Sequence, residues 1–142
     1  MAFIRCESGG GGSVVAVTTL WTNDSPANDF ASQTVTLNDS IQNFDLIEFK
    51  FKADKTSGSA ESSVCYHVED VDKWSNQTIS ANPTAPFLGG LCGRVNAAYF
   101  DWRPIHKVSD TQLNFHEVQQ SGGGANITKA LIPVSITGIK YT

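Results

Sequence analysis

The sequence is short of charge and of the residues that favour surface helices. Charged residues make up 17% of the 142 residues, and the 10 Lys and Arg side chains form no basic run. With a net charge of −4, the chain has no clustered positive patch for a phosphate backbone, which excludes nucleic acid as an expected partner. Ser, Thr, Asn and Gly supply polarity in place of Lys and Glu, a composition typical of strands and turns.

Long apolar runs are also missing. No stretch approaches the roughly 20 apolar residues that a membrane-spanning helix requires, so membrane insertion is not expected. Residues 1–13 contain no apolar segment of the length that a signal peptide needs. We therefore expect the chain to be made in a cytoplasm and to leave it only as part of a larger assembly.

Sequence motifs for catalysis are absent. His67, His106 and His116 have no partner at HExxH-like spacing, no Ser lies in a GxSxG elbow, and the glycine runs lack the Lys-Ser/Thr ending of a phosphate loop. These absences predict a protein that is not an enzyme and that needs neither a cofactor nor a metal ion. Glu48 and Glu117 form the carboxylate pair considered for a glycosidase alternative, because such enzymes hold two carboxylates roughly 5–10 Å apart.

Three cysteines, Cys6, Cys65 and Cys92, show no zinc-site spacing. Cys65 and Cys92 lie in apolar strand contexts, so the leading interpretation is two reduced thiols in the core. A disulfide between them is the alternative, since only geometry decides the matter. Cys6 adjoins a glycine run and is expected to be exposed, either free or cross-linked to another chain.

The chain divides into an arm and one domain. Four consecutive glycines within "SGGGGS", residues 8–13, are costly to order, so residues 1–13 are expected to form a flexible Gly-rich arm. Residues 14–142 have the length of one ordinary domain, which is long enough to bury a core.

Alternation of apolar and polar residues predicts strands throughout this domain. In the clearest case Ile47, Phe49 and Phe51 alternate with charged residues, which indicates a strand with one buried and one solvent-facing side. Pro104 is expected to separate two strands, and Pro133 is expected to mark an edge or a bulge because it lacks a backbone donor. The predicted strands cover residues 14–21, 33–37, 46–54, 64–69, 91–102, 105–108, 112–118 and 127–141, with a further short strand considered at 77–80.

Seven to nine short strands separated by turns predict an all-β fold. No segment shows the period of an amphipathic helix. Strand number and chain length favour a single β-sandwich of the jelly-roll type. Spacing does not separate a jelly roll from an immunoglobulin-like sandwich, although the Cys…Trp…Cys pattern of the latter is not evident.

The tryptophans suggest how a surface could bind. Trp21 and Trp102 lie at the ends of predicted strands and are expected to be core or interface residues. Trp74 lies in a polar segment with Asp72 and Asn76. A ring there could stack on a sugar while the polar groups bind its hydroxyls, which suits a carbohydrate-binding surface. The acidic run "EDVD" around Asp72 admits a weak calcium site, but a solvated turn is favoured.

Several stretches resemble one class of proteins. They are "CESGGGGS" at residues 6–13, "LWTNDSPANDFASQTVTL" at 20–37, "FDLIEFKFK" at 44–52 and "ALIPVSITGIK" at 130–140. Together they resemble small phage virion proteins of the head-fibre, decoration and tail-fibre type. The likeness spans most of the chain but departs from many relatives in the long 70–90 segment, which puts a surface function placed there in doubt.

This resemblance implies a virion surface component that acts by assembly and binding. Such proteins are often symmetric homo-oligomers, for example trimers, and their partners are phage capsid or tail proteins. The arm, with Phe3, Ile4 and Cys6, would supply contacts between chains. Many copies on one particle turn weak contacts into strong avidity, which suits capsid decoration and a tail fibre equally. The alternative is a receptor-binding module for host cell-surface glycans.

Overall fold

The computed structural model describes residues 13–54, 64–72, 90–94, 100–120 and 130–142. Almost all of the expected arm and the strand considered at 77–80 lie outside these ranges. Within them are nine strands and a short 3-10 helix, η1 (Ile41–Asn43). The strands are β1 (Val14–Thr22), β2 (Gln33–Thr36), β3 (Leu46–Asp54), β4 (Val64–Asp70), β5 (Gly90–Arg94), β6 (Phe100–Ser109), β7 (Gln112–Phe115), β8 (Gln119–Gln120) and β9 (Ala130–Tyr141).

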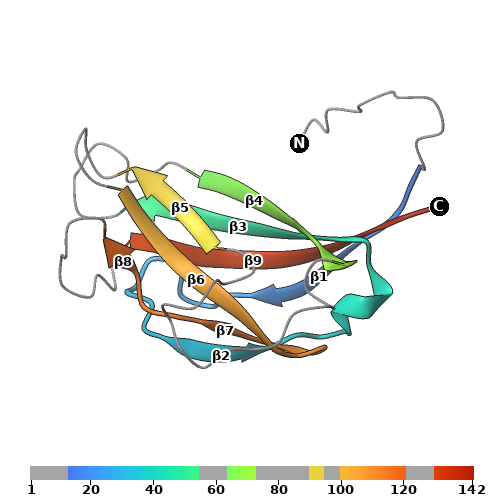
Figure 1. Ribbon diagram of the computed structural model, residues 1–142, viewed down its shortest axis with the longest axis horizontal. Helices are drawn as coiled ribbons and strands as arrows, with labels where there is room; N and C mark the ends of the chain where they lie inside the picture. The colour runs from blue at the N-terminus through green and yellow to red at the C-terminus, as the bar shows by residue number, and fades with distance from the viewer. Residues whose placement is uncertain (1–12, 55–63, 73–89, 95–99, 121–129) are drawn as a thin grey trace.

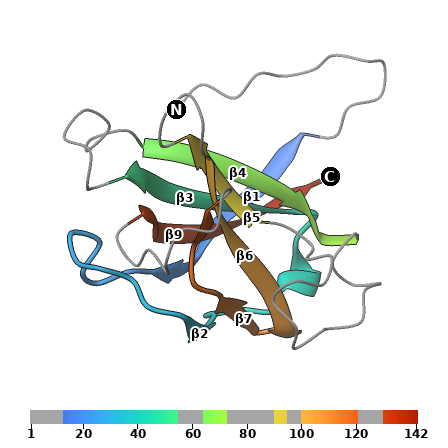
Figure 2. The same cartoon turned by 60° about the vertical axis from the view of Figure 1, so that its left-hand side comes forward.

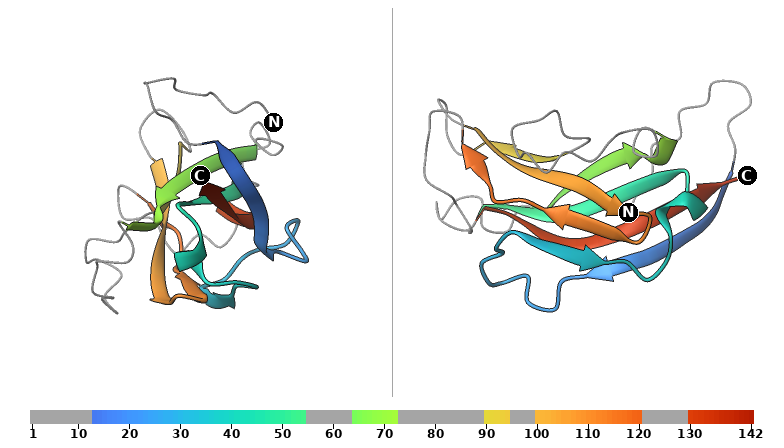
Figure 3. Two further views of the ribbon diagram at one scale, coloured as in Figure 1. Left: turned by 90° about the vertical axis from the view of Figure 1, so that its right-hand side faces the viewer. Right: turned by 60° about the horizontal axis from the view of Figure 1, so that its bottom comes forward.

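The strands form two antiparallel sheets, which confirms the all-β prediction (Figure 1). The four-stranded sheet has the order β1-β9-β3-β4. The five-stranded sheet has the order β2-β7-β6-β5, with β8 paired to β6. Turning the molecule shows the two sheets on either side of a shared interior (Figures 2 and 3).

One cluster of buried side chains from both sheets fills that interior. From β3, the predicted inward residues Ile47, Phe49 and Phe51 are all buried. Phe49 meets Phe115 of β7 edge-to-face, with ring centroids 6.2 Å apart, and so joins the two sheets. Trp21 packs against the same cluster, as expected. Other inward residues predicted from alternation are also buried: Val35, Leu37, Leu113, Phe115 and Val118.

The structure around Pro104 differs from the predicted division into strands. The expected strand 91–102 is divided between β5 and β6, and Pro104 lies inside β6 instead of separating two strands. The Pro104 carbonyl accepts the backbone N–H of His116 at 2.9 Å. In an antiparallel pair of this kind, the reciprocal donor would be the N–H that proline lacks. The Arg103 guanidinium replaces it, since Nη1 donates to the His116 carbonyl at 2.7 Å.

Pro133 lies at a bulge, one of the two predicted situations. Its strand β9 is not an edge, because β1 and β3 flank it. The β3–β9 register shifts between Lys50 and Phe51, so that Ser135 and Pro133 are their partners and Val134 is bypassed. Asn23, directly after β1, completes the bulge: its N–H donates to the Val134 carbonyl and its Nδ2 to the Pro133 carbonyl, both at 2.9 Å.

The 3-10 helix η1, which the sequence pattern did not predict, sets Phe44 against the four-stranded sheet. Ser40 is the N-cap of this helix, and its Oγ accepts the backbone N–H of Gln42. Phe44 follows it and covers Gly138 of β9 so closely that a Cβ at residue 138 would lie 2.6 Å from the ring. Glycine is therefore required at residue 138 by the ring above it.

We predict that Gly138→Ala lowers the free energy of unfolding by roughly 1–3 kcal/mol, the usual cost of overpacking. Denaturant unfolding checks this value. Adding Phe44→Leu should recover part of the loss, because a smaller side chain leaves room for the methyl group. Strictly additive losses in the double variant would show that the Phe44 ring is not the obstacle.

Arg103 of β6 is completely buried, with 0% of its surface exposed. Its Nε donates to the Leu131 carbonyl at 3.0 Å, and its Nη2 donates to the Phe30 carbonyl at 3.1 Å. Together with the His116 carbonyl, these acceptors come from three separate segments of the chain. The guanidinium also lies over the Phe30 ring, 5.3 Å from its centroid. Burial lowers the pKa of Arg103 to about 10, which leaves it charged at neutral pH.

We predict that Arg103→Met lowers the free energy of unfolding by roughly 2–4 kcal/mol, because it leaves buried carbonyls without donors. Arg103→Lys should lose nearly as much, since a single ammonium group does not reproduce the planar fork of the guanidinium. Thermal and denaturant unfolding measure both variants. A stability equal to that of the wild type in either one would contradict the bridging role.

Candidate interaction surface

The edge strand β4 turns its apolar side chains outward. Val64, Tyr66 and Val68 are 43%, 48% and 46% exposed, whereas Cys65, His67 and Glu69 are more buried. The β3–β4 register explains this, because His67 pairs with the inward-facing Phe49. In a strand with one side against a core, the apolar set normally faces inward. The reverse arrangement gives β4 an apolar outward side, next to the charged outward residues of β3.

The outward apolar side chains continue across the four-stranded sheet. Val17 of β1, 53% exposed, pairs with Ile139 of β9, which is only 3% exposed and pairs in turn with Leu46 of β3. Val14 is a further exposed apolar residue of β1. We call the side of the sheet formed by these residues the outer face; it comprises Val14, Val17, Leu46, Val64, Tyr66, Val68 and Ile139. It spans all four strands and has two exposed apolar margins, on β1 and β4.

Glu48 lies in the middle of this outer face. It pairs with Val68 of β4 and Thr137 of β9, and only 8% of its surface is exposed. The prediction of a solvent-facing side for β3 is therefore wrong at this residue. Burial raises the pKa of the Glu48 carboxyl from its ordinary value of 4.5, while Lys50 two residues away acts in the opposite direction.

The inward side of β4 holds polar groups that satisfy one another. The His67 ring and the Glu69 carboxylate lie 2.6 Å apart, joined by His67 Nε2 and Glu69 Oε1. The His67 ring also lies beside Phe49, with ring centroids 6.3 Å apart. Cys65 is a free, half-buried thiol packed against the core, as the interpretation of reduced cysteines predicts. This mutual pairing allows Glu69 to be buried on the core side of an edge strand.

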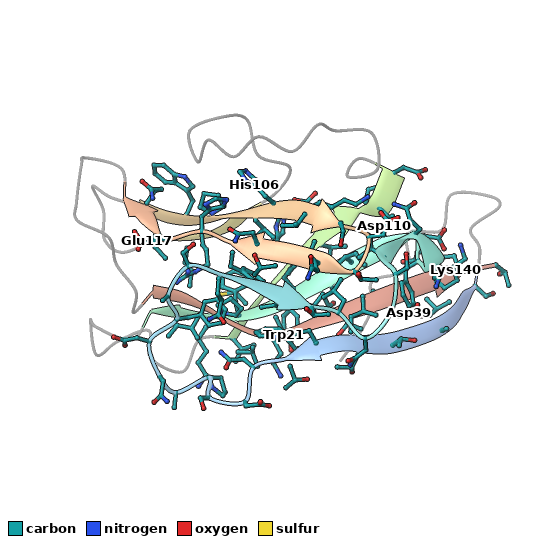
Figure 4. All side chains as sticks on the ribbon, turned by 90° about the horizontal axis from the view of Figure 1, so that it is seen from below. Trp21, Asp39, His106, Asp110, Glu117 and Lys140 are labelled. Carbon is teal, nitrogen blue, oxygen red and sulfur yellow. The ribbon has the colours of Figure 1, made fainter. Side chains whose placement is uncertain are left out.

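The five-stranded sheet carries a pair of histidines on the side away from the core. His106 of β6 is 7% exposed, and its Nδ1 lies 2.8 Å from Nε2 of His116, which directly follows β7. Figure 4 labels His106 at the orange strands of the five-stranded sheet and Trp21 at the blue strand β1; Trp21 packs against the core. Burial lowers the pKa of both rings, and the charge of His106 lowers that of His116 further. Both imidazoles are consequently neutral at neutral pH.

Most of the residues proposed from sequence for binding lie outside the described ranges. These are Phe3, Ile4, Cys6, Trp74 and Asn76, together with the side chain of Cys92. Asp72 is described and exposed, and its N–H donates to Asp70 Oδ1 at 2.9 Å. This bond closes the turn that was favoured over a calcium site at the "EDVD" run.

The carboxylates considered for glycosidase chemistry are placed on different sheets. Glu48 faces outward from the four-stranded sheet, whereas Glu117 lies between β7 and β8 of the other sheet and interacts with Arg103. The core therefore lies between them. Among the described residues, no group of three or more His, Cys, Asp or Glu side chains is arranged to hold a metal ion. Trp102 is half-buried on β6, on the opposite side of that strand from Arg103.

Comparisons with known proteins yield no relative from which a function could be transferred. No family model matches the chain, and no curated protein matches it either. In the part of the chain that the structure describes, no helix has the length and apolarity to cross a bilayer.

We predict that Glu48→Gln raises the melting temperature at neutral pH. The raised pKa means that the ionised carboxylate destabilises the folded state, and this penalty disappears as the pH falls through the folded-state pKa. The difference between variant and wild type should therefore shrink as the pH approaches 4.5 and below. Asp24→Asn, a change at an exposed carboxylate, is the control. A Glu48→Gln variant that is less stable at neutral pH would show that the charge is stabilised where it lies.

Proposed function

We propose that the protein is a structural component of a bacteriophage particle, located on the capsid surface or in a tail fibre. In this proposal it acts by assembling into a homo-oligomer and binding virion proteins, without catalysis. The supporting observation is the exposed apolar side of β4 at one edge of the sheet, together with the exposed Val17 of β1 at the other edge; Ile139, between them, is 3% exposed. The sequence resemblance to small virion proteins supplies the biological setting.

The outer face suits contact with a second copy of the chain. Its exposed margins are valines and a tyrosine, side chains whose burial stabilises an interface by roughly 25 cal/mol for each Å² removed from water. Strand β4 is also an edge of its sheet, so one side of its backbone has no partner strand among the described elements. The charges of this face lie on β3, between the two margins: Glu48 is mostly covered, and Lys50 and Lys52 pair with Tyr66 and Val64.

We further propose that the fold is a jelly-roll-like β-sandwich. The first strand pairs with the last, β1 with β9, and the second strand pairs with the late strand β7. This nesting is expected when one long antiparallel ribbon wraps around a core. Strands β3 and β4 pair within one sheet. The fold therefore resembles a jelly roll in the way the chain wraps around the core, and not in the position of every strand.

Binding of host glycans is the alternative proposal, and it is compatible with assembly because an oligomer presents several sites. It rests on the sequence around Trp74 and Asn76. Of the three residues assigned to it, the structure describes Asp72, exposed beyond the end of β4.

We predict that the purified protein is an oligomer and that Tyr66→Ser with Val68→Ser weakens it. Each side chain contributes roughly 1.5–3 kcal/mol when fully buried, so the dissociation constant should rise by about tenfold or more for each substitution. Size-exclusion chromatography with light scattering, over a range of protein concentrations, measures the shift. Val108→Ser is the matched control, because Val108 is 42% exposed on the other sheet and should leave assembly unchanged.

Two results would overturn the proposal. A wild-type protein that is monomeric at every concentration would remove the assembly role. Phage particles that carry no label from an antibody against this chain would remove the virion location. An oligomer that is insensitive to both outer-face substitutions would move the interface elsewhere.

A further inference from the structure

The histidine pair of the five-stranded sheet is built on adjacent strands that hold both rings in place. His106 pairs in register with Asn114 of β7, and His116 lies opposite Pro104 through the backbone bond already described. All three polar side chains, His106, Asn114 and His116, therefore project from the same side of the β6–β7 hairpin. The two rings meet edge to face, with centroids 4.4 Å apart.

Asn114 supplies a second, independent observation. Its Nδ2 donates to Thr34 Oγ1 of β2 at 3.0 Å. Its Oδ1 is buried and has no hydrogen-bond partner among the described residues. A buried amide oxygen without a donor is costly, by roughly 1–3 kcal/mol. Asn114 is the register partner of His106, and directly opposite residues in an antiparallel pair have Cβ atoms about 5 Å apart, so the Asn114 side chain is a neighbour of the histidine pair.

We propose that His106 and His116 bind a divalent transition-metal ion of the nickel or copper class, through His106 Nδ1 and His116 Nε2, with Asn114 Oδ1 as a third donor. Neutral imidazole is the form in which histidine binds a metal ion. The site belongs to the sheet opposite the outer face and does not depend on the proposed assembly.

The separation of the two ring nitrogens is compared with the separations that different coordination geometries require. Two nitrogens, each about 2.0 Å from one ion, are about 2.8–2.9 Å apart at the right angle of square-planar or octahedral coordination, and about 3.3 Å apart at the tetrahedral angle. The hydrogen-bonded nitrogens are already 2.8 Å apart, so an ion with right-angle coordination would require less movement of the rings than a tetrahedral one. Nickel and copper ions prefer such geometries, whereas zinc prefers the tetrahedral one.

Proton balance is simple in this site. In the hydrogen-bonded pair, one ring donates from its converging nitrogen to the other. For both nitrogens to bind an ion, that ring must change tautomer, so that its proton leaves the converging nitrogen and a proton occupies its far nitrogen. The neutral pair therefore binds the ion without net release of a proton.

The test is calorimetric titration of the tag-free, full-length protein with nickel chloride, together with the thermal melt. We expect one ion per chain and a melting temperature that rises with nickel concentration. Loss of a residue that only orients a metal ligand weakens metal binding by about 10–100-fold. His106→Ala and His116→Ala, which remove the ligands themselves, should each raise the nickel dissociation constant by at least that factor. Asn114→Ala should weaken binding less. His67→Ala, which removes a histidine paired with Glu69 on the other sheet, should leave it unchanged.

A second variant guards against a loss of binding caused by unfolding. His116→Gln keeps a polar side chain at the same place, and its melting temperature without nickel reports whether the fold is intact. A folded His116→Gln protein with much weaker nickel binding supports the site. The proposal is overturned if the wild type shows no saturable nickel binding, or if His106→Ala and His116→Ala bind nickel as the wild type does. The two histidines would then be a hydrogen-bonded pair without a metal-binding role.

Discussion

The hydrogen bonds of the buried Arg103 guanidinium organise the structure. They bring together the carbonyls of Phe30 before β2, His116 after β7 and Leu131 at the start of β9. Each of these segments leads into or out of a strand, and they belong to both sheets. A charged group with five donors in a rigid plane can satisfy several carbonyls at once, which an apolar side chain of the same size cannot.

Two backbone irregularities depend on this arrangement. Proline at residue 104 removes a donor from the β6–β7 pairing, and Arg103 supplies the missing donor to His116. Leu131, whose carbonyl accepts Arg103 Nε, has a φ of 49°, the left-handed region that leucine rarely adopts. Its side chain is fully buried, so packing and the hydrogen bond together hold a conformation that is locally unfavourable.

The sequence predicted the parts of the fold that follow from alternation. The bounds of β3 and the inward residues of β2, β3 and β7 were correct, because burying one face of a strand imposes a period of two. Strand β4 shows the limit of this signal: its apolar residues alternate clearly, yet they face outward. Which face of β4 is buried depends on its register with β3, which pairs His67 with Phe49. The sequence of a single strand does not determine its register with a neighbouring strand.

The candidate sites were harder to predict for the same reason. His106 and His116 are ten residues apart and share no metal-binding motif, so sequence reasoning treated them separately. A hairpin between the predicted strands 105–108 and 112–118 would have suggested their proximity, but the register shift between Lys107 and Ser109 decides which residues meet. Arg103 gave no local signal either, since arginine is rarely buried and its partners are backbone atoms distant in sequence.

The two sheets consequently present different surfaces. On the four-stranded sheet, the outer face is apolar at both margins, and its one central carboxylate is mostly covered. On the five-stranded sheet, the side away from the core carries neutral imidazoles and an amide, groups that bind an ion or a polar ligand better than an apolar surface. Because the core separates them, a partner on one surface leaves the other open. A chain that assembles through one sheet can therefore use the other for a second function in every copy of the assembly.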